Sequence, residues 1–484
     1  MKKKLLIISA IIAASPMLYS FCGFYVSKAD GTIKNKTSQV ILVRDGNKSV
    51  ITMYNDFKGD VKDFAMVVPV PVVLQKSDIK VTDNGIFQRL NDYSAPRLVE
   101  YFDENPCELR VMDMAVSVPS MNKSMREESK LYKDKSLGVI VEASYTVGEY
   151  DILILSAKES SGLKTWLTDN GYKIPKGAEE VLEPYIKSNL KFFVVKVNVK
   201  EKEKTGLENL RPIQIKFNSP KFMLPIRLGM ANADGDQDMI IYAFTRQGRI
   251  ETTNYRTVAL PTGKNIPLFV KKNFSDFYTN LFRYQWKKED ERIAFLEYAW
   301  DVSPSNYVKC DPCVSNPPDN NDLKIAGVWW LGNNDEDYIN GRAPGGSVYF
   351  TRLHVRYNRS AFPQDLSFQV TPNTENFQAR YIITHPATGS FNCEEGKKYL
   401  DNLKERRRKE LNMLAALTGK DASDWNITLN DEENMNITAD VSYSHLSQLS
   451  PDELTKPDSN STEKIILASA VILGCISAVK YKGR

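Results

Sequence analysis

The chain has little histidine and few cysteines, and neither sign of charge predominates. Its 484 residues include 3 His and 6 Cys, and 64 Lys+Arg against 60 Asp+Glu give a formal net charge of +4. A dedicated nucleic-acid-binding protein concentrates basic side chains on one surface, so we expect no nucleic-acid partner. Hydrophobic residues make up 42% and charged residues 26%, close to ordinary globular usage, which excludes whole-chain disorder and a polytopic membrane protein.

Complete catalytic and cofactor motifs are also missing. The sequence has no Gly-x-Ser-x-Gly elbow, no P-loop and no dinucleotide fingerprint. Asn232–Asp238 resembles a calcium loop, but Gly235 falls fourth instead of sixth and Ala243 takes the twelfth position, which needs Glu. We therefore predict a polar turn there and no cofactor, with zinc and calcium left as alternatives. The sequence alone leaves open whether the chain is an enzyme.

The first twenty residues have the layout of a secretory signal peptide. Lys2–Lys4 form a basic start, and Leu5–Ala14 form an apolar run that is too short to span a bilayer. We therefore predict that residues 1–20 direct export. The Leu18 side chain is larger than those usual before a cleavage site.

The C-terminal end reads as a tether followed by a short membrane anchor. Ile465–Val479 is uncharged and flanked by lysines, which can reach the membrane interface, so we predict a transmembrane helix at 464–480. It is short for a hydrocarbon core of ~30 Å, and a sorting tail that is later removed would look similar. The polar stretch 419–463 is predicted to be a tether, and 481–484 a basic tail on the inner side of the membrane. The body would then lie in the periplasm or outside the cell.

The region between these ends is predicted to be an α+β fold. Apolar and β-branched runs on either side of Asp45–Lys48 indicate a hairpin. Helical spacing recurs at Ser161–Asn170 and Glu179–Lys187. The predicted regions are an N-terminal β-rich domain at 21–136, a mixed α/β domain at 137–208, a β-rich domain with the Cys-Asp-Pro-Cys motif at 209–391, and a helix at 392–418. We therefore expect a β-rich, sandwich-like ectodomain with a few helices.

Five cysteines lie outside the predicted anchor. They are Cys22, Cys107, Cys310, Cys313 and Cys393. An exported chain tends to oxidise its thiols, so two disulfides and one odd cysteine are expected, with the pairing open. Cys22 is also a candidate for lipid attachment, although the bulky Phe21 departs from the usual sequence.

Cys310-Asp311-Pro312-Cys313 is the most specific local motif. A redox-active Cys-x-x-Cys usually begins a helix, whose dipole lowers the thiol pKa, but Pro317 and Pro318 prevent a continuing helix here. A structural disulfide is therefore the favoured interpretation. A metal site is the alternative, in which Cys310 and Cys313 would be joined by His354 or His385.

Three potential cations alternate along one predicted strand. Period-two spacing places Arg352, His354 and Arg356 on one face, where they could bind a phosphate or a carboxylate. The favoured alternative is that they pair with acidic side chains on neighbouring strands.

Several segments together resemble a known family. They are Phe64–Pro71, Tyr93–Tyr101, Ala157–Leu163, Cys310–Cys313, Thr351–His354 and the helix after Cys393. In combination, and to about Asn426, they are similar to the DUF2330 family of exported bacterial proteins of unknown function. Members carry a signal peptide and some carry a C-terminal hydrophobic anchor, so the resemblance implies placement in the cell envelope. It implies no catalytic residue.

The sequence thus predicts an exported, membrane-anchored envelope protein. Residues 465–479 would contact the membrane, and the ectodomain would be a non-catalytic binding or scaffold module with an unidentified partner. The alternative is a metal- or thiol-dependent envelope enzyme that uses Cys310 and Cys313 with His354 or His385.

Overall fold

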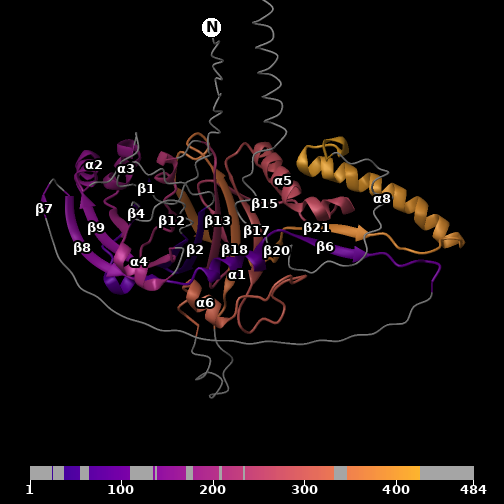
Figure 1. The fold of residues 1–484 in the computed structure, drawn as a ribbon, viewed down its shortest axis with the longest axis horizontal. Helices are drawn as coiled ribbons and strands as arrows, with labels where there is room; N and C mark the ends of the chain where they lie inside the picture. Colours follow the sequence, from indigo (N-terminus) through magenta and orange to yellow (C-terminus); the bar gives the residue numbers. More distant parts are fainter. Residues whose placement is uncertain are drawn as a thin grey trace, which may run out of the picture. The chain divides into compact units, whose positions relative to one another are not determined.

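The structure is a computed structural model, and it describes most of the chain between residues 24 and 425 (Figure 1). The described residues are 24–25, 38–54, 65–108, 135–136, 139–170, 178–206, 210–232, 235–331 and 346–425. The predicted signal peptide, Cys22, the anchor at 464–480, the tail at 481–484 and the tether beyond residue 425 lie outside them, so these remain predictions. Within the described ranges, no helix is both long and apolar enough to cross a membrane.

The fold is mixed α+β and rich in strands, and it forms two compact units. The described residues of unit 1 come from Met1–Pro96, Arg110–Thr262 and Trp286–Ala379. Those of unit 2 come from Arg97–Leu109, Gly263–Gln285 and Arg380–Arg484. Each unit therefore collects segments that are far apart in the sequence.

Unit 1 contains a six-stranded antiparallel sheet. Its strands, in spatial order, are β1 (Phe24–Tyr25), β4 (Ala65–Val70), β10 (Lys191–Val197), β9 (Tyr150–Ala157), β8 (Val139–Val147) and β7 (Lys135–Ser136). β8 and β9 are consecutive in the chain and form a hairpin, whereas β4 and β10 come from distant segments. The sheet thus combines residues from the first two predicted regions.

The second large sheet of unit 1 has nine strands. In spatial order they are β15 (Arg256–Ala259), β17 (Ile293–Asp301), β18 (Tyr349–Tyr357), β13 (Gln237–Thr245), β2 (Ser38–Asp45), β3 (Lys48–Tyr54), β11 (Ile213–Asn218) and β5 (Ile79–Val81), with β20 (Phe377–Gln378) also paired to β17. β2 and β3 form the hairpin expected around Asp45–Lys48. β2 also pairs in parallel with β13, so the predicted boundaries at 136 and 208 do not separate the sheets.

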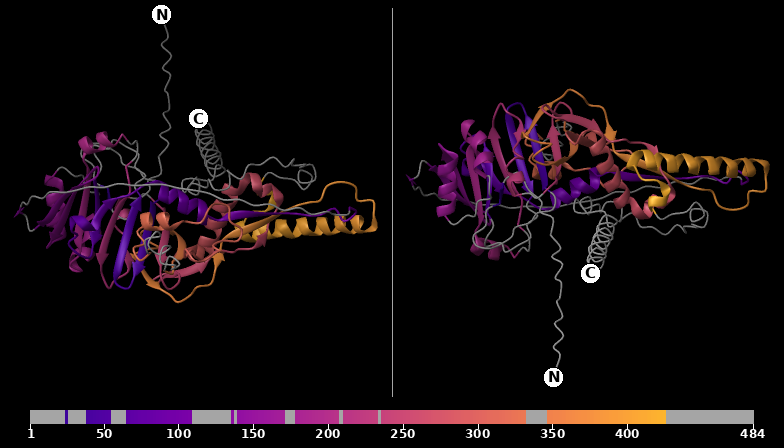
Figure 2. Two further views of the ribbon diagram at one scale, coloured as in Figure 1. Left: turned by 90° about the horizontal axis from the view of Figure 1, so that it is seen from below. Right: turned by 90° about the horizontal axis from the view of Figure 1, so that it is seen from above.

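Alternate residues of each strand face opposite layers, as the period of a β-strand requires. In β10, Phe193 and Val195 enter a core shared by both sheets, while Phe192 and Val194 pack with α2 (Ser160–Asp169) and α3 (Ala178–Lys187). In β13, Ile241 faces the shared core, and the other side of the strand packs with α1 (Gly85–Ser94) and α6 (Asn320–Ala326). The two sheets therefore pack face to face, with a helical layer on each outer side (Figures 1 and 2).

Unit 1 is completed by smaller elements. These are α4 (Val199–Thr205), η2 (Lys76–Asp78), η3 (Gly229–Asn232) and a three-stranded sheet of β12 (Met223–Leu224), β19 (Leu366–Val370) and β14 (Ile250–Thr252).

Unit 2 is built on a small parallel sheet. Its strands are β16 (Lys264–Asn265), β21 (Arg380–His385) and β6 (Arg97–Phe102), and its helices are η4 (Leu268–Asn273), most of α5 (Phe274–Lys288), α8 (Glu394–Thr418) and η5 (Ala422–Trp425). α8 corresponds to the helix predicted at 392–418. Cys393 caps its N-terminus, with Sγ accepting a hydrogen bond from the Gly396 backbone N–H at 3.2 Å, and Gly419 ends it at a φ of 68°.

The shared core of unit 1 generates the first prediction. Ile154 on β9 is fully buried in that core, so Ile154→Ala should lower the free energy of unfolding by about 2–5 kcal/mol through lost contacts and a residual cavity. Urea unfolding followed by circular dichroism measures this. Ile140→Ala on the neighbouring β8 is the matched control, and its partly exposed side chain should give a clearly smaller loss. Equal losses would contradict the assignment of this core.

Candidate functional site

The cations predicted on one strand face lie together in β18. Arg352, His354 and Arg356 share the face of the sheet that packs toward α1, because Leu353 and Val355 point into the shared core. Their side chains are almost completely buried, at 2%, 0% and 6% exposure. Burial of three cations is costly unless acidic partners accompany them.

Two buried carboxylates on the neighbouring strands supply those partners. Arg352 Nε donates to Glu297 Oε2 of β17 at 2.5 Å, and Arg356 donates from Nη2 and Nε to both oxygens of Asp238 of β13, at 2.6 and 3.0 Å. His354 lies between them, with Nδ1 2.8 Å from Glu297 Oε1 and Nε2 3.1 Å from Asp238 Oδ1. These five side chains form a charge network across three adjacent strands.

The geometry fixes the charge of His354. Both ring nitrogens face ionised carboxylates, which only accept hydrogen bonds, so both must donate and the ring is an imidazolium. Burial alone lowers the pKa of His354, but Glu297 and Asp238 outweigh it and raise the pKa above its ordinary value. Burial likewise raises the pKa of Asp238, but Arg356 and His354 reverse the effect and lower it to about 2.

A β-bulge sets the position of Glu297. The register between β17 and β18 shifts between Leu296 and Tyr298, so Glu297 is the extra residue. Leu296 faces the shared core of the two sheets, whereas Tyr298 faces the layer of α1 and α6. The bulge therefore adds a carboxylate to the cationic face and changes the face on which the following residues lie.

The charge network contains residues of two of the candidate sites. Arg352, His354 and Arg356 meet Glu297 and Asp238 on the neighbouring strands, so each of the three cations shares a carboxylate partner within the fold. Asp238, the last residue of the calcium-like segment, has both oxygens bonded to Arg356, and one of them to His354 as well.

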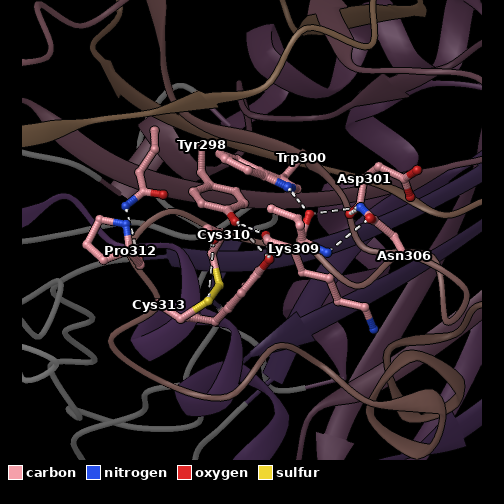
Figure 3. The surroundings of a disulfide bond; sticks show 11 residues. Tyr298, Trp300, Asp301, Asn306, Lys309, Cys310, Pro312 and Cys313 are labelled. Carbon is pink, nitrogen blue, oxygen red and sulfur yellow. Dashed lines mark hydrogen bonds between the residues drawn. A yellow bond between two sulfur atoms is a disulfide. The ribbon is translucent and has the colours of Figure 1, made fainter. Parts of the chain in front are cut away.

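Cys310 and Cys313 form a disulfide with each other in the loop that follows β17 (Figure 3). Residues that follow the bulge in β17 form hydrogen bonds to the backbone of this loop. The Tyr298 hydroxyl lies 2.8 Å from the Lys309 carbonyl oxygen, and Trp300 Nε1 donates to the Val308 carbonyl at 2.8 Å. Tyr93 of α1 also donates its hydroxyl to the Lys309 carbonyl.

The outer side of this loop presents apolar groups to solvent. Tyr307 is fully exposed and Val308 is 64% exposed, although their neighbours are fixed by Tyr298 and Trp300. Cys310 is buried at 7% exposure, whereas Cys313 is exposed. The disulfide closes a small ring at Cys310–Cys313, and the exposed Tyr307 and Val308 lie just before it in the same loop.

Unit 2 contains the second disulfide and the second candidate histidine. Cys107 pairs with Cys393 at the N-terminus of α8, across a sequence separation of 286. His385 Nε2 lies 2.6 Å from Glu100 Oε2, and Lys271 Nζ bonds to the same oxygen at 2.7 Å. Burial raises the pKa of Glu100, but the interactions with Lys271 and His385 outweigh it and lower the pKa below its ordinary value.

The four residues of the metal-site alternative belong to three different parts of the structure. Cys310 is bonded to Cys313, His354 lies in the charge network, and His385 belongs to unit 2. Within the described ranges, no group of three or more His, Cys, Asp or Glu side chains is arranged to hold a metal ion.

Sequence reasoning missed the residues that support these sites. Glu297, Tyr298 and Trp300 stand in one apolar run and are buried; Glu297 completes the charge network, and the other two also hold the disulfide loop. Glu100 was also missed. In both strands the available signal was an acidic residue flanked by apolar residues.

The fold and these sites define a strand-rich, disulfide-bonded α+β protein. The chain belongs to the family described as uncharacterized protein conserved in bacteria (DUF2330), whose model matches residues 16–369. That match includes the charge network and the Cys310–Cys313 loop, and it ends before α8, short of the Asn426 limit expected from sequence. No curated protein and no solved structure matches the chain.

The charge network predicts how stability depends on pH. Asp238 has a folded pKa of about 2 against 3.8 unfolded, so its contribution of about 2 kcal/mol is complete above pH 3.8 and is lost as the pH falls toward 2. The raised pKa of His354 stabilises the fold fully below pH 6.5, and this contribution is lost as the pH rises through the folded pKa. His354→Gln should therefore flatten the alkaline decline and cost about 3–5 kcal/mol, because it leaves two carboxylates with fewer partners.

Urea unfolding at a series of pH values tests this. His385→Gln is the matched control and should keep the alkaline decline that His354 produces. The same decline in wild type and His354→Gln would contradict a charged His354.

Proposed function

We propose that this chain is an exported cell-envelope protein, anchored in the membrane by residues 465–479, whose ectodomain binds a partner and does not catalyse a reaction. The Cys107–Cys393 disulfide is the observation that carries the export part of the proposal. Disulfides persist in the periplasm and outside the cell, and they are rare in the reducing cytosol. The signal-peptide layout of residues 1–20 supports the same compartment.

The binding role is supported by the surface of the Cys310–Cys313 loop. Tyr307 and Val308 are exposed, while the carbonyl groups of Val308 and Lys309 are held by Trp300 and Tyr298, just before the disulfide. Tyr is enriched at the centres of protein interfaces, and a rigid loop loses little conformational entropy on binding. The partner we propose is another protein of the envelope.

The groups that chemistry would need are engaged in the fold, which further supports a non-catalytic role. Both nitrogens of His354 bond to carboxylates, and His385 bonds to Glu100. Cys310 and Cys313 are bonded to each other. Each of these groups already has a structural partner.

A second candidate function, thiol–disulfide exchange, is favoured by one observation. Cys313 is exposed while Cys310 is buried, so an incoming thiolate could attack Cys313 Sγ. The disulfide bond would break, a mixed disulfide would form at Cys313, and Cys310 would leave as a thiolate. The resulting protein would transfer oxidising equivalents to an envelope thiol.

Export predicts the state of the thiols. The full chain is expressed in bacteria, its free thiols are alkylated without reduction, and the cysteine peptides are identified by mass spectrometry. The Cys107 and Cys393 peptides should be recovered linked. A chain lacking residues 1–20 is the control and should carry both as alkylated thiols, because it stays in the reducing cytosol.

The same preparation tests the anchor. The full chain should sediment with membranes, and a chain ending at residue 463 should be recovered without them. Free Cys107 and Cys393 in the full chain would contradict export, and membrane association of the shorter chain would contradict an anchor at 465–479.

Redox titration separates binding from exchange. If the loop is a structural recognition element, Cys310–Cys313 should resist glutathione and show a potential below about −300 mV, as structural disulfides do. Quantitative mass spectrometry of alkylated Cys313 in graded glutathione buffers measures this, with Cys107–Cys393 as the internal comparison. Reduction at the potential of a catalytic disulfide would favour exchange over the binding proposal.

A further inference from the structure

A hollow of about 300 Å³ lies at the tip of the β2–β3 hairpin in unit 1. We call it the Arg44 hollow, and the lining side chains that matter here are Arg44, Asp45, Phe222, Arg246 and Phe368. They come from the hairpin, from the loop before β12, from the turn after β13 and from β19. The hollow is separate from the charge network and from the disulfide loop.

Arg44 is a buried cation whose hydrogen-bond partners among the described residues are all neutral. It is 6% exposed, and its guanidinium donates to Ser49 Oγ at 2.8 Å and to the carbonyl oxygens of Asn47 and Pro220 at 3.2 and 3.4 Å. Among the residues that the structure describes, no carboxylate forms an ion pair with Arg44. Burial lowers its pKa, but a guanidinium keeps its proton at any physiological pH. A charge buried in this way is stabilised when an anion reaches it.

The second arginine of the hollow, Arg246, pairs with a carboxylate and stays partly exposed. Arg246 Nε donates to Asp45 Oδ2 at 2.7 Å, and the Arg246 side chain remains 41% exposed. Asp45 is the acidic residue of the lining and pairs with Arg246, whereas Arg44 has no carboxylate partner among the described residues. The hollow therefore keeps one uncompensated positive charge.

The wall beside Arg44 is aromatic. The Arg44 guanidinium lies over the Phe222 ring, 5.2 Å from its centroid, and the Phe222 and Phe368 rings are 5.3 Å apart. Phe368 is buried at 6% exposure, so its ring is held in place. A ligand that reached Arg44 would contact these rings with its uncharged part.

We propose that the Arg44 hollow binds a small organic monocarboxylate. Its two oxygens match the planar fork of a guanidinium, and its single charge matches the one that the hollow leaves uncompensated. Its hydrocarbon part lies against Phe222 and Phe368, and the volume suits a molecule of a few carbon atoms to one aromatic ring. This assignment is independent of export and of the Cys310–Cys313 loop.

Calorimetric titration of the full chain with benzoate tests the proposal, with acetate and inorganic phosphate as comparison anions. Benzoate should bind, acetate should bind more weakly because it lacks the ring, and phosphate should bind more weakly because it carries more charge than the hollow leaves uncompensated. Arg246→Gln removes the rim guanidinium without disturbing a buried group, and it should weaken benzoate at least tenfold. Arg44→Lys keeps the charge but loses the fork, and should weaken it similarly.

Arg256→Gln is the matched control, because Arg256 is an exposed arginine of the same unit whose ion pair is with Glu289. It should leave the benzoate affinity unchanged. Failure of wild type to bind benzoate at millimolar concentration, equal affinity in Arg246→Gln and wild type, or tighter binding of phosphate than of benzoate would each overturn the proposal. If Arg44→Lys fails to fold, Arg246→Gln and the comparison anions still decide.

Discussion

Two buried carboxylates hold the centre of the nine-stranded sheet together. Glu297 and Asp238 come from strands on either side of β18 and pair with cations that would otherwise be buried without partners. Removing one partner from such a network is far more destabilising than replacing the whole network with apolar residues, because the charge left behind stays buried without a partner. The network therefore selects one register for three strands: a slip by one residue would turn its charges toward the core that the two sheets share.

The same region connects the interior of unit 1 to its surface. The bulge that places Glu297 also reverses the faces of the residues after it, so Tyr298 and Trp300 point toward the layer of α1. From there they hold the carbonyl groups of the loop that carries the disulfide. A local irregularity in one strand thus serves both the buried charges and the exposed loop.

Local patterns predicted the local structure. The turn at Asp45–Lys48 and the helix α8 follow from short-range preferences, and period-two alternation placed Arg352, His354 and Arg356 on one face. The parallel pairing of β2 with β13 could not be predicted, because it joins segments about 200 residues apart through a shared core. The bulge at Glu297 could not be predicted either, because the cations that Glu297 pairs with lie on another strand. No local sequence pattern predicts the Arg44 hollow, because its walls come from four turns and strands that are far apart in the chain.

The disulfide of unit 2 has a topological consequence. It links Cys107 to Cys393 and so closes a covalent ring that contains the whole segment between them. If a protease cuts once within that ring, the two pieces remain one molecule until the bond is reduced. Whatever holds the segment after Cys393 in place therefore also retains everything before Cys107. A copy cut in this way would keep its N-terminal part, whereas a copy without the disulfide would lose it.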